Sequence, residues 1–191
     1  MSEYKVKGLS SPALVGYAGI PNMLVHGFDM HRVYLSCPGD LDADKQLCRE
    51  VIGEINEAQA MPANILLVSV GLPQEGAVEQ FRAAVADNIR QCAYFIQVFQ
   101  DDWGPRNLSR KLFYLACDAR GDESLPMKEV VVFLKGAPRE TDPEILAFRK
   151  ELAELSDVLV FHFDTPDAMR RQLHEVASAW VNHIQAAAAN A

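Results

Sequence analysis

The sequence alternates five short apolar runs with stretches of helical periodicity, and this alternation limits the fold more than any other feature. The runs are rich in β-branched and aromatic residues and cover residues 33–37, 64–70, 94–99, 129–134 and 158–163. Apolar residues recur every three or four positions over residues 41–59, 78–91, 108–119, 143–155 and 166–184. Near-continuous apolar strands are typical of a parallel sheet covered on both faces.

This order of elements predicts an α/β fold with a doubly wound, five-stranded parallel sheet. Five strands favour the flavodoxin-like order 2-1-3-4-5 over the six-stranded dinucleotide-binding arrangement. Thr165 is expected to cap the last helix, with Pro166 at its first position. The Ala-rich tail from Ala186 is expected to fray.

Residues 1–31 have no sustained period and are interrupted by Gly, Pro and Ser. They are predicted to form an N-terminal extension, either an arm lying on the domain or an ordered segment leading to an interface. Their apolar residues argue against pure disorder. Residues 32–187 then form one α/β domain. Because an apolar extension can cover a sheet edge or pair protomers, self-association or a protein partner is expected.

The charge balance limits the partners of this chain. The formal net charge is -8, from 18 basic and 26 acidic residues, and no basic stripe is present. This pattern disfavours nucleic acid and favours a neutral small molecule or another protein. No apolar run reaches the roughly 20 residues of a membrane span, and the first residues lack a signal-peptide pattern. We therefore expect a cytoplasmic protein that does not contact membranes.

The cysteines and histidines show no metal-binding pattern. Neither type of residue has the spacing of a zinc site, and no C-x-x-C pair occurs. The sequence therefore predicts reduced thiols, no metal and no cofactor. The four cysteines are Cys37, Cys48, Cys92 and Cys117, of which Cys48 and Cys92 fall on the apolar positions of helical patterns.

A ligand site is expected beside strands 1 and 3, outside their carboxyl ends, where the strand order reverses. The loop after the first apolar run supplies one wall: Ser36, Cys37, Pro38, Gly39 and Asp40. Gly39 permits a sharp turn, and Asp40 is expected to cap the following helix. Because Asp40, Asp42 and Asp44 crowd this helix start, a sugar hydroxyl or a neutral group is expected there rather than a phosphate. A simple turn and helix cap is the alternative.

Two further loops complete the expected site. After the third run come Asp101, Asp102, Trp103 and Gly104, whose carboxylates can hold ribose hydroxyls while the indole stacks on a base. The alternative is an exposed acidic turn with an anchoring aromatic residue. The third wall, residues 71–77, contains Gly71 and Glu75 and has the length of a lid or binding loop. An exposed charge is the simpler interpretation of Glu75.

Three stretches resemble bacterial TIR-like domains of unknown function. VYLSCPGDLDADKQLCREVIGEIN (33–56) is similar to their opening, a V-F-I-S-S strand, then Pro/Thr-x-Asp, then a helix rich in Glu and Arg. NIRQCAYFIQVFQDDWG (88–104) and EVVVFLK (129–135) resemble later parts, so the similarity covers residues 32–163. The resemblance implies a flavodoxin-like domain used in bacterial signalling and defence. Catalytic relatives cleave the nicotinamide–ribose bond of NAD, and nucleoside deoxyribosyltransferases share the layout.

The resemblance also implies where a catalytic carboxylate would lie. In the enzymes, a glutamate stands on the helix after strand 3 in a Ser-x-x-x-Glu-Tyr stretch. The matching stretch NLSRKLFYLACDA (107–119) keeps Ser109 and Tyr114 but has Phe113 in place of the glutamate. A carboxylate there would stabilise an oxocarbenium-like transition state or form a covalent adduct.

The expected function is therefore a TIR-like signalling or interaction module. It would bind a nucleotide-like ligand at the carboxyl ends of strands 1 and 3, with Ser109 on the adjacent helix. The alternative is an enzyme that breaks an N-glycosidic bond, as an NAD glycohydrolase or a nucleoside deoxyribosyltransferase-like enzyme. Its catalytic carboxylate would then be Asp101, Asp102 or Glu75.

Overall fold

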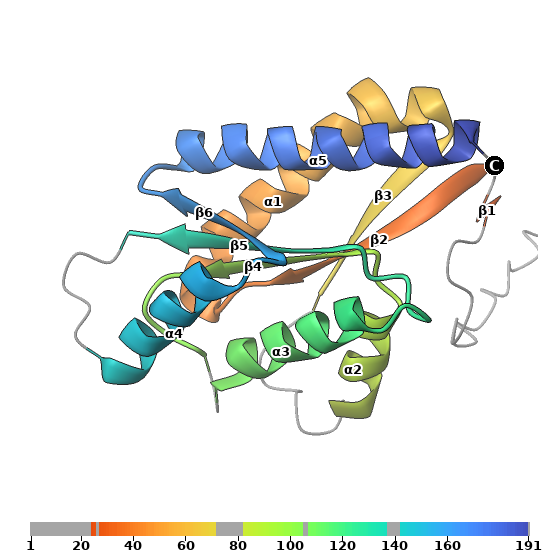
Figure 1. Ribbon diagram of the computed structural model, residues 1–191. Helices are drawn as coiled ribbons and strands as arrows, with labels where there is room; N and C mark the ends of the chain where they lie inside the picture. The colour runs from red at the N-terminus through yellow and green to blue at the C-terminus, as the bar shows by residue number, and fades with distance from the viewer. Residues whose placement is uncertain (1–23, 26, 72–81, 105–106, 137–141, 191) are drawn as a thin grey trace, which may run out of the picture.

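A computed structural model describes residues 24–25, 27–71, 82–104, 107–136 and 142–190. They form one sheet with helices on both faces (Figure 1). Five parallel strands pair in the order β3-β2-β4-β5-β6, which is 2-1-3-4-5 when these strands are counted along the chain. The predicted doubly wound α/β fold is confirmed. The strands are β2 (Phe28–Ser36), β3 (Ile65–Val70), β4 (Tyr94–Phe99), β5 (Glu129–Lys135) and β6 (Val158–Phe163).

The helices are divided unequally between the two faces of the sheet (Figure 1). α1 (Asp42–Ile55) and α5 (Pro166–Ala189) cover one face. α2 (Arg82–Arg90), α3 (Leu108–Gly121) and α4 (Pro143–Glu154) cover the other. No helix within the described residues has both the length and the apolar character needed to cross a membrane.

The first parallel strand is longer than the sequence predicted. β2 begins at Phe28 rather than Val33, and a two-residue strand, β1 (Leu24–Val25), pairs with its start in the antiparallel direction. Residues 28–31 alternate apolar and polar side chains and Arg32 follows them, so this segment lacks the continuous apolar run that marked the other strands. Their backbone is nevertheless paired, because the Asp29 N–H donates to the Asn64 carbonyl oxygen at 2.7 Å.

The region predicted as one helix over residues 41–59 consists of α1 and shorter helical turns on either side of it. A 3-10 turn, η1 (Gly39–Leu41), precedes α1, and a π-helical turn, η2 (Asn56–Ala60), and a second 3-10 turn, η3 (Met61–Ala63), follow it. The Asn56 side-chain amide donates to the Leu67 carbonyl oxygen at 2.8 Å and accepts from the Leu67 N–H at 2.9 Å. This double hydrogen bond satisfies backbone groups on the edge of β3 that faces away from β2.

The last helix agrees with the prediction at its start but not at its end. Thr165 caps α5 by accepting from the Ala168 N–H, and Pro166 occupies the first helical position, as predicted. The tail was expected to fray from Ala186; in the structure α5 continues to Ala189, and the Asn190 side-chain amide donates to the Ala186 carbonyl oxygen at 2.8 Å. Alanine has the highest intrinsic helix propensity, which explains this continuation. The first residues of the predicted helix 78–91 lie outside the described part of the chain.

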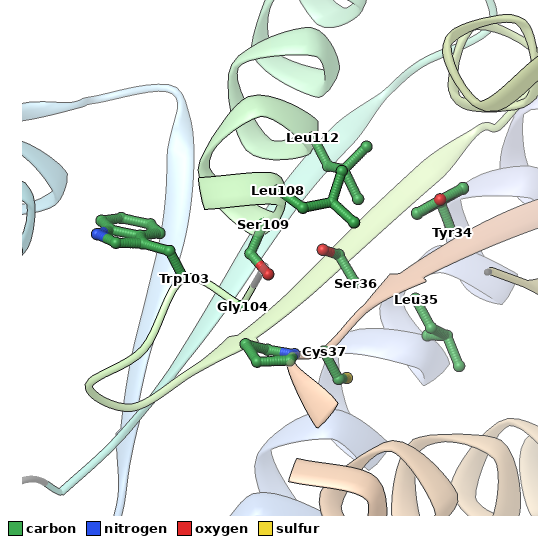
Figure 2. Close-up of a pocket in the computed structure, with 10 residues that line it drawn as sticks. Tyr34, Leu35, Ser36, Cys37, Trp103, Gly104, Leu108, Ser109 and Leu112 are labelled. Atoms are coloured by element: carbon green, nitrogen blue, oxygen red, sulfur yellow. The ribbon is translucent and has the colours of Figure 1, made fainter. Parts of the chain in front are cut away.

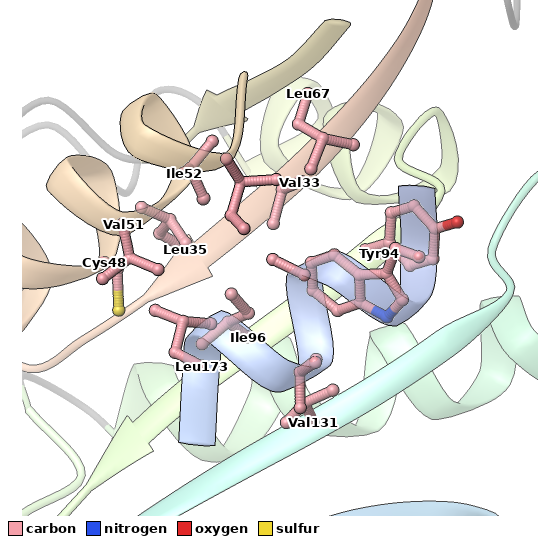
Figure 3. Packing of buried hydrophobic residues seen from close by; sticks show 14 of the residues in the cluster. Val33, Leu35, Cys48, Val51, Ile52, Leu67, Tyr94, Ile96, Val131 and Leu173 are labelled. Atoms are coloured by element: carbon pink, nitrogen blue, oxygen red, sulfur yellow. The ribbon is translucent and has the colours of Figure 1, made fainter. Parts of the chain in front are cut away.

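The core consists of two apolar layers, one on each face of the sheet. Side chains alternate between the faces along each strand, so neighbouring strand residues contribute to different layers. Figure 3 shows one layer, in which α1 and α5 pack against the central strands. Its members include Val33, Leu35, Ile96 and Val131 from the strands and Cys48, Val51, Ile52 and Leu173 from the helices.

An aromatic cluster forms the opposite layer where α3 and α4 meet the sheet. Phe148 of α4 lies at the centre of this cluster and is 1% exposed. The centroid of its ring is 4.4 Å from that of Trp103, 5.3 Å from Phe113 and 5.6 Å from Phe99, in edge-to-face arrangements. Edge-to-face aromatic contacts stabilise a fold beyond the burial of area alone.

Replacing Phe148 with alanine should lower the free energy of unfolding by about 3–5 kcal/mol, because it leaves a cavity between three aromatic rings. Urea denaturation measures this change. The matched control is Leu146→Ala on the same helix, whose side chain is 47% exposed and whose loss should change stability by about 0.5 kcal/mol or less. Equal losses for the two variants would contradict the packing described here.

His31 is a buried titratable group in the amino-terminal half of β2, away from Ser36 at the carboxyl end of the strand. Its Nε2 lies 2.9 Å from Asp29 Oδ2, while its buried Nδ1 has no hydrogen-bond partner within the described residues. Burial lowers the pKa of His31, and the hydrogen bond with Asp29 opposes this only in part; the charge of Lys128 lowers it further. The Tyr94 ring lies 6.5 Å away on β4. The folded protein therefore favours neutral histidine.

The free energy of unfolding should fall as the pH decreases below about 6.5, the ordinary pKa of histidine in an unfolded chain. Below that pH the unfolded state binds the proton more readily than the folded state, and the loss is complete once the pH is below the folded pKa. His31→Gln should reduce this slope between pH 7 and 5 in urea denaturation. The exposed His183 provides the control variant, His183→Gln, which should keep the wild-type slope.

Candidate functional site

A small hollow lies at the carboxyl ends of β2 and β4, where the strand order reverses (Figure 2). Its volume is about 30 Å³. About 10–15 Å³ suffices for one water molecule, whereas sites that enclose whole small molecules have roughly 300–1,000 Å³. The hollow therefore admits one or two groups the size of water. Its lining consists of Tyr34, Leu35, Ser36, Cys37, Pro38, Trp103, Gly104, Leu108, Ser109 and Leu112.

Buried polar groups without partners gather on the face of the sheet below this hollow. The Ser36 Oγ and the Tyr34 hydroxyl are buried and have no hydrogen-bond partner among the described residues. Ser36 is paired with Gln97 in the β2–β4 register, so both side chains point to the same face. Gln97 is 0% exposed, and its Oε1 also lacks a partner there. Buried polar atoms normally have a hydrogen-bond partner. These unpaired atoms are therefore the strongest indication that a water molecule or a ligand binds here.

The first turn of α3 forms the other side of the hollow. The hydroxyls of Ser36 and Ser109 face each other across it (Figure 2). No side chain caps the start of this helix, where Asn107 adopts a left-handed conformation with φ 56°, and the first turn contains no acidic residue. Burial raises the pKa of Tyr34, so its hydroxyl stays protonated and can donate. The site thus combines hydroxyl donors and acceptors with a helix start that favours electron-rich groups.

Trp103 is positioned as an anchor for the loop after β4. Its ring turns away from the two serines (Figure 2). It packs against Phe99 and Phe148, each with a centroid distance of 4.4 Å, and the Arg110 guanidinium lies 5.6 Å from its centroid. Since these contacts surround the ring, the arrangement favours the anchoring role over stacking on a base. The Trp103 side chain still borders the hollow.

The two carboxylates beside Trp103 lie outside the hollow. Asp101 and Asp102 are exposed, and Asp102 Oδ1 accepts a hydrogen bond from the Gly104 N–H at 2.9 Å. Gly104 has φ 67°, a conformation that favours glycine. Asp102 thus stabilises the turn in which it lies. No aspartate or glutamate belongs to the lining formed by the described residues.

The loop after β2 contributes less than the sequence suggested. Cys37 and Pro38 line the hollow, but Asp40 does not belong to its described lining. The prediction that Asp40 caps the following helix is wrong, because α1 begins after Leu41 without a side-chain cap. Asp40 lies inside the intervening 3-10 turn, so its side chain is not at the capping position. The Leu41 N–H instead donates to the Pro38 carbonyl oxygen at 3.0 Å.

The acidic start of α1 is partly neutralised by β5. Asp40 and Asp42 are exposed, whereas Asp44 is 4% exposed and its Oδ2 lies 2.8 Å from Lys135 Nζ. This ion pair joins the first turn of α1 to the carboxyl end of β5. It uses the Lys135 ammonium, which is therefore not free to bind an anionic ligand. The exposed acidic residues leave this rim of the site unfavourable for phosphate.

The loop expected to form the third wall covers residues 71–77, of which the structure describes only Gly71. Gly71 follows β3 and lies against the backbone of β2, since a Cβ there would come within 2.8 Å of the Leu35 carbonyl oxygen. Gly71 thus permits close packing of two backbones and does not line the hollow. Glu75 lies outside the described residues.

Phe113, which the resemblance to TIR-like domains aligns with the glutamate of the enzymes, does not line the hollow. Phe113 is 0% exposed and belongs to the aromatic layer with Phe148. The residues of α3 that line the hollow are Leu108, Ser109 and Leu112. Thus neither the expected position nor its neighbours on α3 provide a carboxylate to the hollow.

Sequence reasoning missed several residues of the candidate site: Tyr34, Leu35, Gln97, Leu108 and Leu112. Gln97 gave a usable signal, because it is the only polar side chain apart from Tyr94 in the run YFIQVF. A polar residue in the middle of a strand that is buried on both faces needs a partner. Tyr34, Leu35, Leu108 and Leu112 gave no such signal, since they fit a core position equally well.

A larger open groove lies between the ends of α2 and α3, with a volume of about 410 Å³. Its lining includes Arg90, Asp118 and Asp122. Hydrogen bonds from the backbone and side chain of Ser124 lower the pKa of Asp122, so this carboxylate stabilises its own turn. The groove contains no buried polar atom without a partner among the described residues, and we do not consider it the main site.

Within the described residues, no group of three or more His, Cys, Asp or Glu side chains could hold a metal ion. In comparisons with known proteins, no protein-family model matches this sequence, and no curated protein matches it.

Proposed function

We propose that this chain is a TIR-like signalling or interaction module of the cytoplasm that binds a nucleotide-like ligand at the carboxyl ends of β2 and β4. The observation that carries the proposal is the group of buried, unpartnered Ser36, Tyr34 and Gln97 atoms at the point where the strand order reverses. A polar tip of the ligand, such as a ribose hydroxyl, would enter the hollow and supply the missing hydrogen bonds. The rest of the ligand would lie across the rim.

The chemistry of the rim supports a ligand with few negative charges. Asp40, Asp42, Asp101 and Asp102 are exposed around the two loops. Lys135 is paired with Asp44, and the Arg149 guanidinium donates to the carbonyl oxygens of Gln100 and Lys135. A nucleoside or a dinucleotide is therefore favoured over a nucleoside triphosphate.

The module would also contact a protein partner or a second copy of itself. Among the described strands, β6 forms an edge of the sheet and carries Leu159, which is 42% exposed. An edge strand presents unpaired backbone groups that can pair with another chain. This edge supports an interaction role in addition to ligand binding.

Adenosine or NAD should raise the melting temperature of the purified protein, and ATP should raise it less. A ligand at 100 times its Kd adds about 2.7 kcal/mol of stability, which for a chain of this size corresponds to roughly 5–10 °C. Differential scanning fluorimetry measures this shift. Absence of any shift with all three compounds would contradict binding at this site.

Ser36→Ala separates binding from a purely structural role. The variant should weaken binding roughly 3- to 10-fold, the loss of one hydrogen bond. Without ligand it should be as stable as the wild type or more stable, because it removes a buried hydroxyl that has no partner. The matched control is Ser156→Ala, at an exposed turn before β6, which should leave the ligand-induced shift unchanged.

Incubation with NAD or with deoxynucleosides should release no nicotinamide or free base above the buffer rate. The physical reason is that the described lining contains no carboxylate to stabilise an oxocarbenium-like transition state. Chromatography of the products checks this. Turnover that is lost in Asp102→Asn or Glu75→Gln would establish the alternative, an enzyme that breaks an N-glycosidic bond.

A further inference from the structure

Within the described sheet, β6 is an edge strand, with α5 over one face and α4 over the other (Figure 1). One hydrogen bond fixes the direction of its backbone groups. The Phe163 carbonyl oxygen accepts from the Gly136 N–H at 3.0 Å, so it points toward β5. Because backbone groups alternate in direction along a strand, the N–H and C=O groups of Val160 and His162 point away from β5, along the edge.

Side chains of the described residues cover only part of this edge. The Gln172 side-chain amide donates to the His162 carbonyl oxygen at 3.0 Å, while its buried Oε1 has no described hydrogen-bond partner. The N–H and C=O of Val160 have no hydrogen bond among the described residues. At β3, on the opposite edge, Asn56 uses both atoms of its amide on the N–H and C=O of Leu67. In the described sheet, β6 is therefore less protected against an added strand than β3.

The face of β6 toward α5 is apolar and partly exposed. Leu159 is 42% exposed. Phe161 is also partly exposed, although its ring stacks on that of Phe133 of β5 with a centroid distance of 5.4 Å. Because side chains alternate along a strand, Leu159 and Phe161 point to the same face. An added strand would extend this face and bring apolar side chains against both of them.

Negative charge surrounds both ends of β6. Residues 151–169 contain five carboxylates and no lysine or arginine. Asp157 is partly balanced by Arg120, whose Nη1 lies 3.7 Å from its Oδ2. A second copy of this chain would bring like charges together along the edge, which disfavours pairing of β6 with itself. A basic partner is favoured instead. The exposed carboxylates of this stretch are Glu154, Asp157, Asp164 and Asp167.

We propose that the open edge of β6 takes up an extended, basic segment of a partner protein as an additional strand. The backbone of this segment would pair with Val160 and would replace Gln172 at the His162 carbonyl oxygen. Its apolar side chains would cover Leu159 and Phe161, and its lysines or arginines would lie beside the acidic ends of β6. This inference rests on the interaction role proposed above and names the chemistry of the partner.

The test uses the purified full-length protein and a fluorescein-labelled peptide, KKVTVTVTKK, whose fluorescence anisotropy reports binding. The matched peptide EEVTVTVTEE keeps the apolar pattern and reverses the charges. We expect the basic peptide to bind, more weakly as salt is added, and the acidic peptide to bind at least roughly 10-fold more weakly. Binding of neither peptide, or equal binding of both, would overturn the proposal.

Single variants locate the binding on β6. Leu159→Lys should weaken binding of the basic peptide roughly 10-fold, whereas Met61→Lys on η3, where the side chain is also 42% exposed, should leave it unchanged. Gln172→Ala frees the His162 carbonyl oxygen and should strengthen binding roughly 3- to 10-fold, a gain that a purely structural role of Gln172 would not give. Its control is Gln46→Ala, at an exposed position of α1. Unchanged binding in Leu159→Lys or in Gln172→Ala would contradict docking at this edge.

Two further measurements distinguish this inference from its alternatives. Sedimentation velocity detects self-association, and a wild-type dimer that is lost in Leu159→Lys would show a second copy on the edge and overturn the proposal. The melting-temperature shift with adenosine or NAD does not involve β6. A protein that keeps this shift but binds no basic peptide would refute only the docking at β6. A protein that binds the peptide without showing the shift would refute only the nucleotide site.

Discussion

The backbone of β2 is hydrogen-bonded on both of its edges, to β3 over residues 29–34 and to β4 over residues 33–36, and the rest of the structure depends on this double pairing. Because both edges of β2 are paired, the next two parallel strands lie on opposite sides of it, β3 on one side and β4 on the other. The loops that leave β2 and β4 therefore separate, and the hollow opens between them. The same register aligns Ser36 with Gln97 and so gathers polar atoms at that point.

The packing on the α3 face determines which side chains of α3 reach the hollow. Phe113, Phe148 and Trp103 form one aromatic cluster that joins two helices to the loop after β4. Phe113, which the resemblance to TIR-like domains aligns with the glutamate of the enzymes, supplies one of the rings of this cluster. A carboxylate at residue 113 would be buried without a partner and would destabilise the cluster without reaching the hollow. Within the described residues, the packing that stabilises this face thus also keeps the side chain of residue 113 away from the hollow.

The strand order and the general place of the site could be predicted from the sequence, because both follow from hydrophobic periodicity and from the rules of parallel sheets. The orientation of particular side chains could not. Trp103 is held by Phe148, a residue 45 positions later in the chain, and no local pattern indicates that contact. The Asp102 carboxylate accepts a hydrogen bond within its own turn and does not line the hollow. This arrangement depends on the left-handed conformation of Gly104. The start of β2 was missed because it pairs with β3 through the backbone, while its sequence, which includes Asp29 and His31, has no continuous apolar run.

The position of α5 has a consequence for how the protein reaches its native state in the cell. This helix packs on the central strands through residues such as Leu173 and Trp180, and Trp180 stacks on Tyr94 of β4 at 4.1 Å between ring centroids. A nascent chain that has left the ribosome only as far as β6 therefore exposes the apolar face of its middle strands. At about 5–20 residues per second, the translation of the 24 residues of α5 leaves that face open for seconds. During this interval a chaperone that binds apolar strands would compete directly with the helix for the same surface.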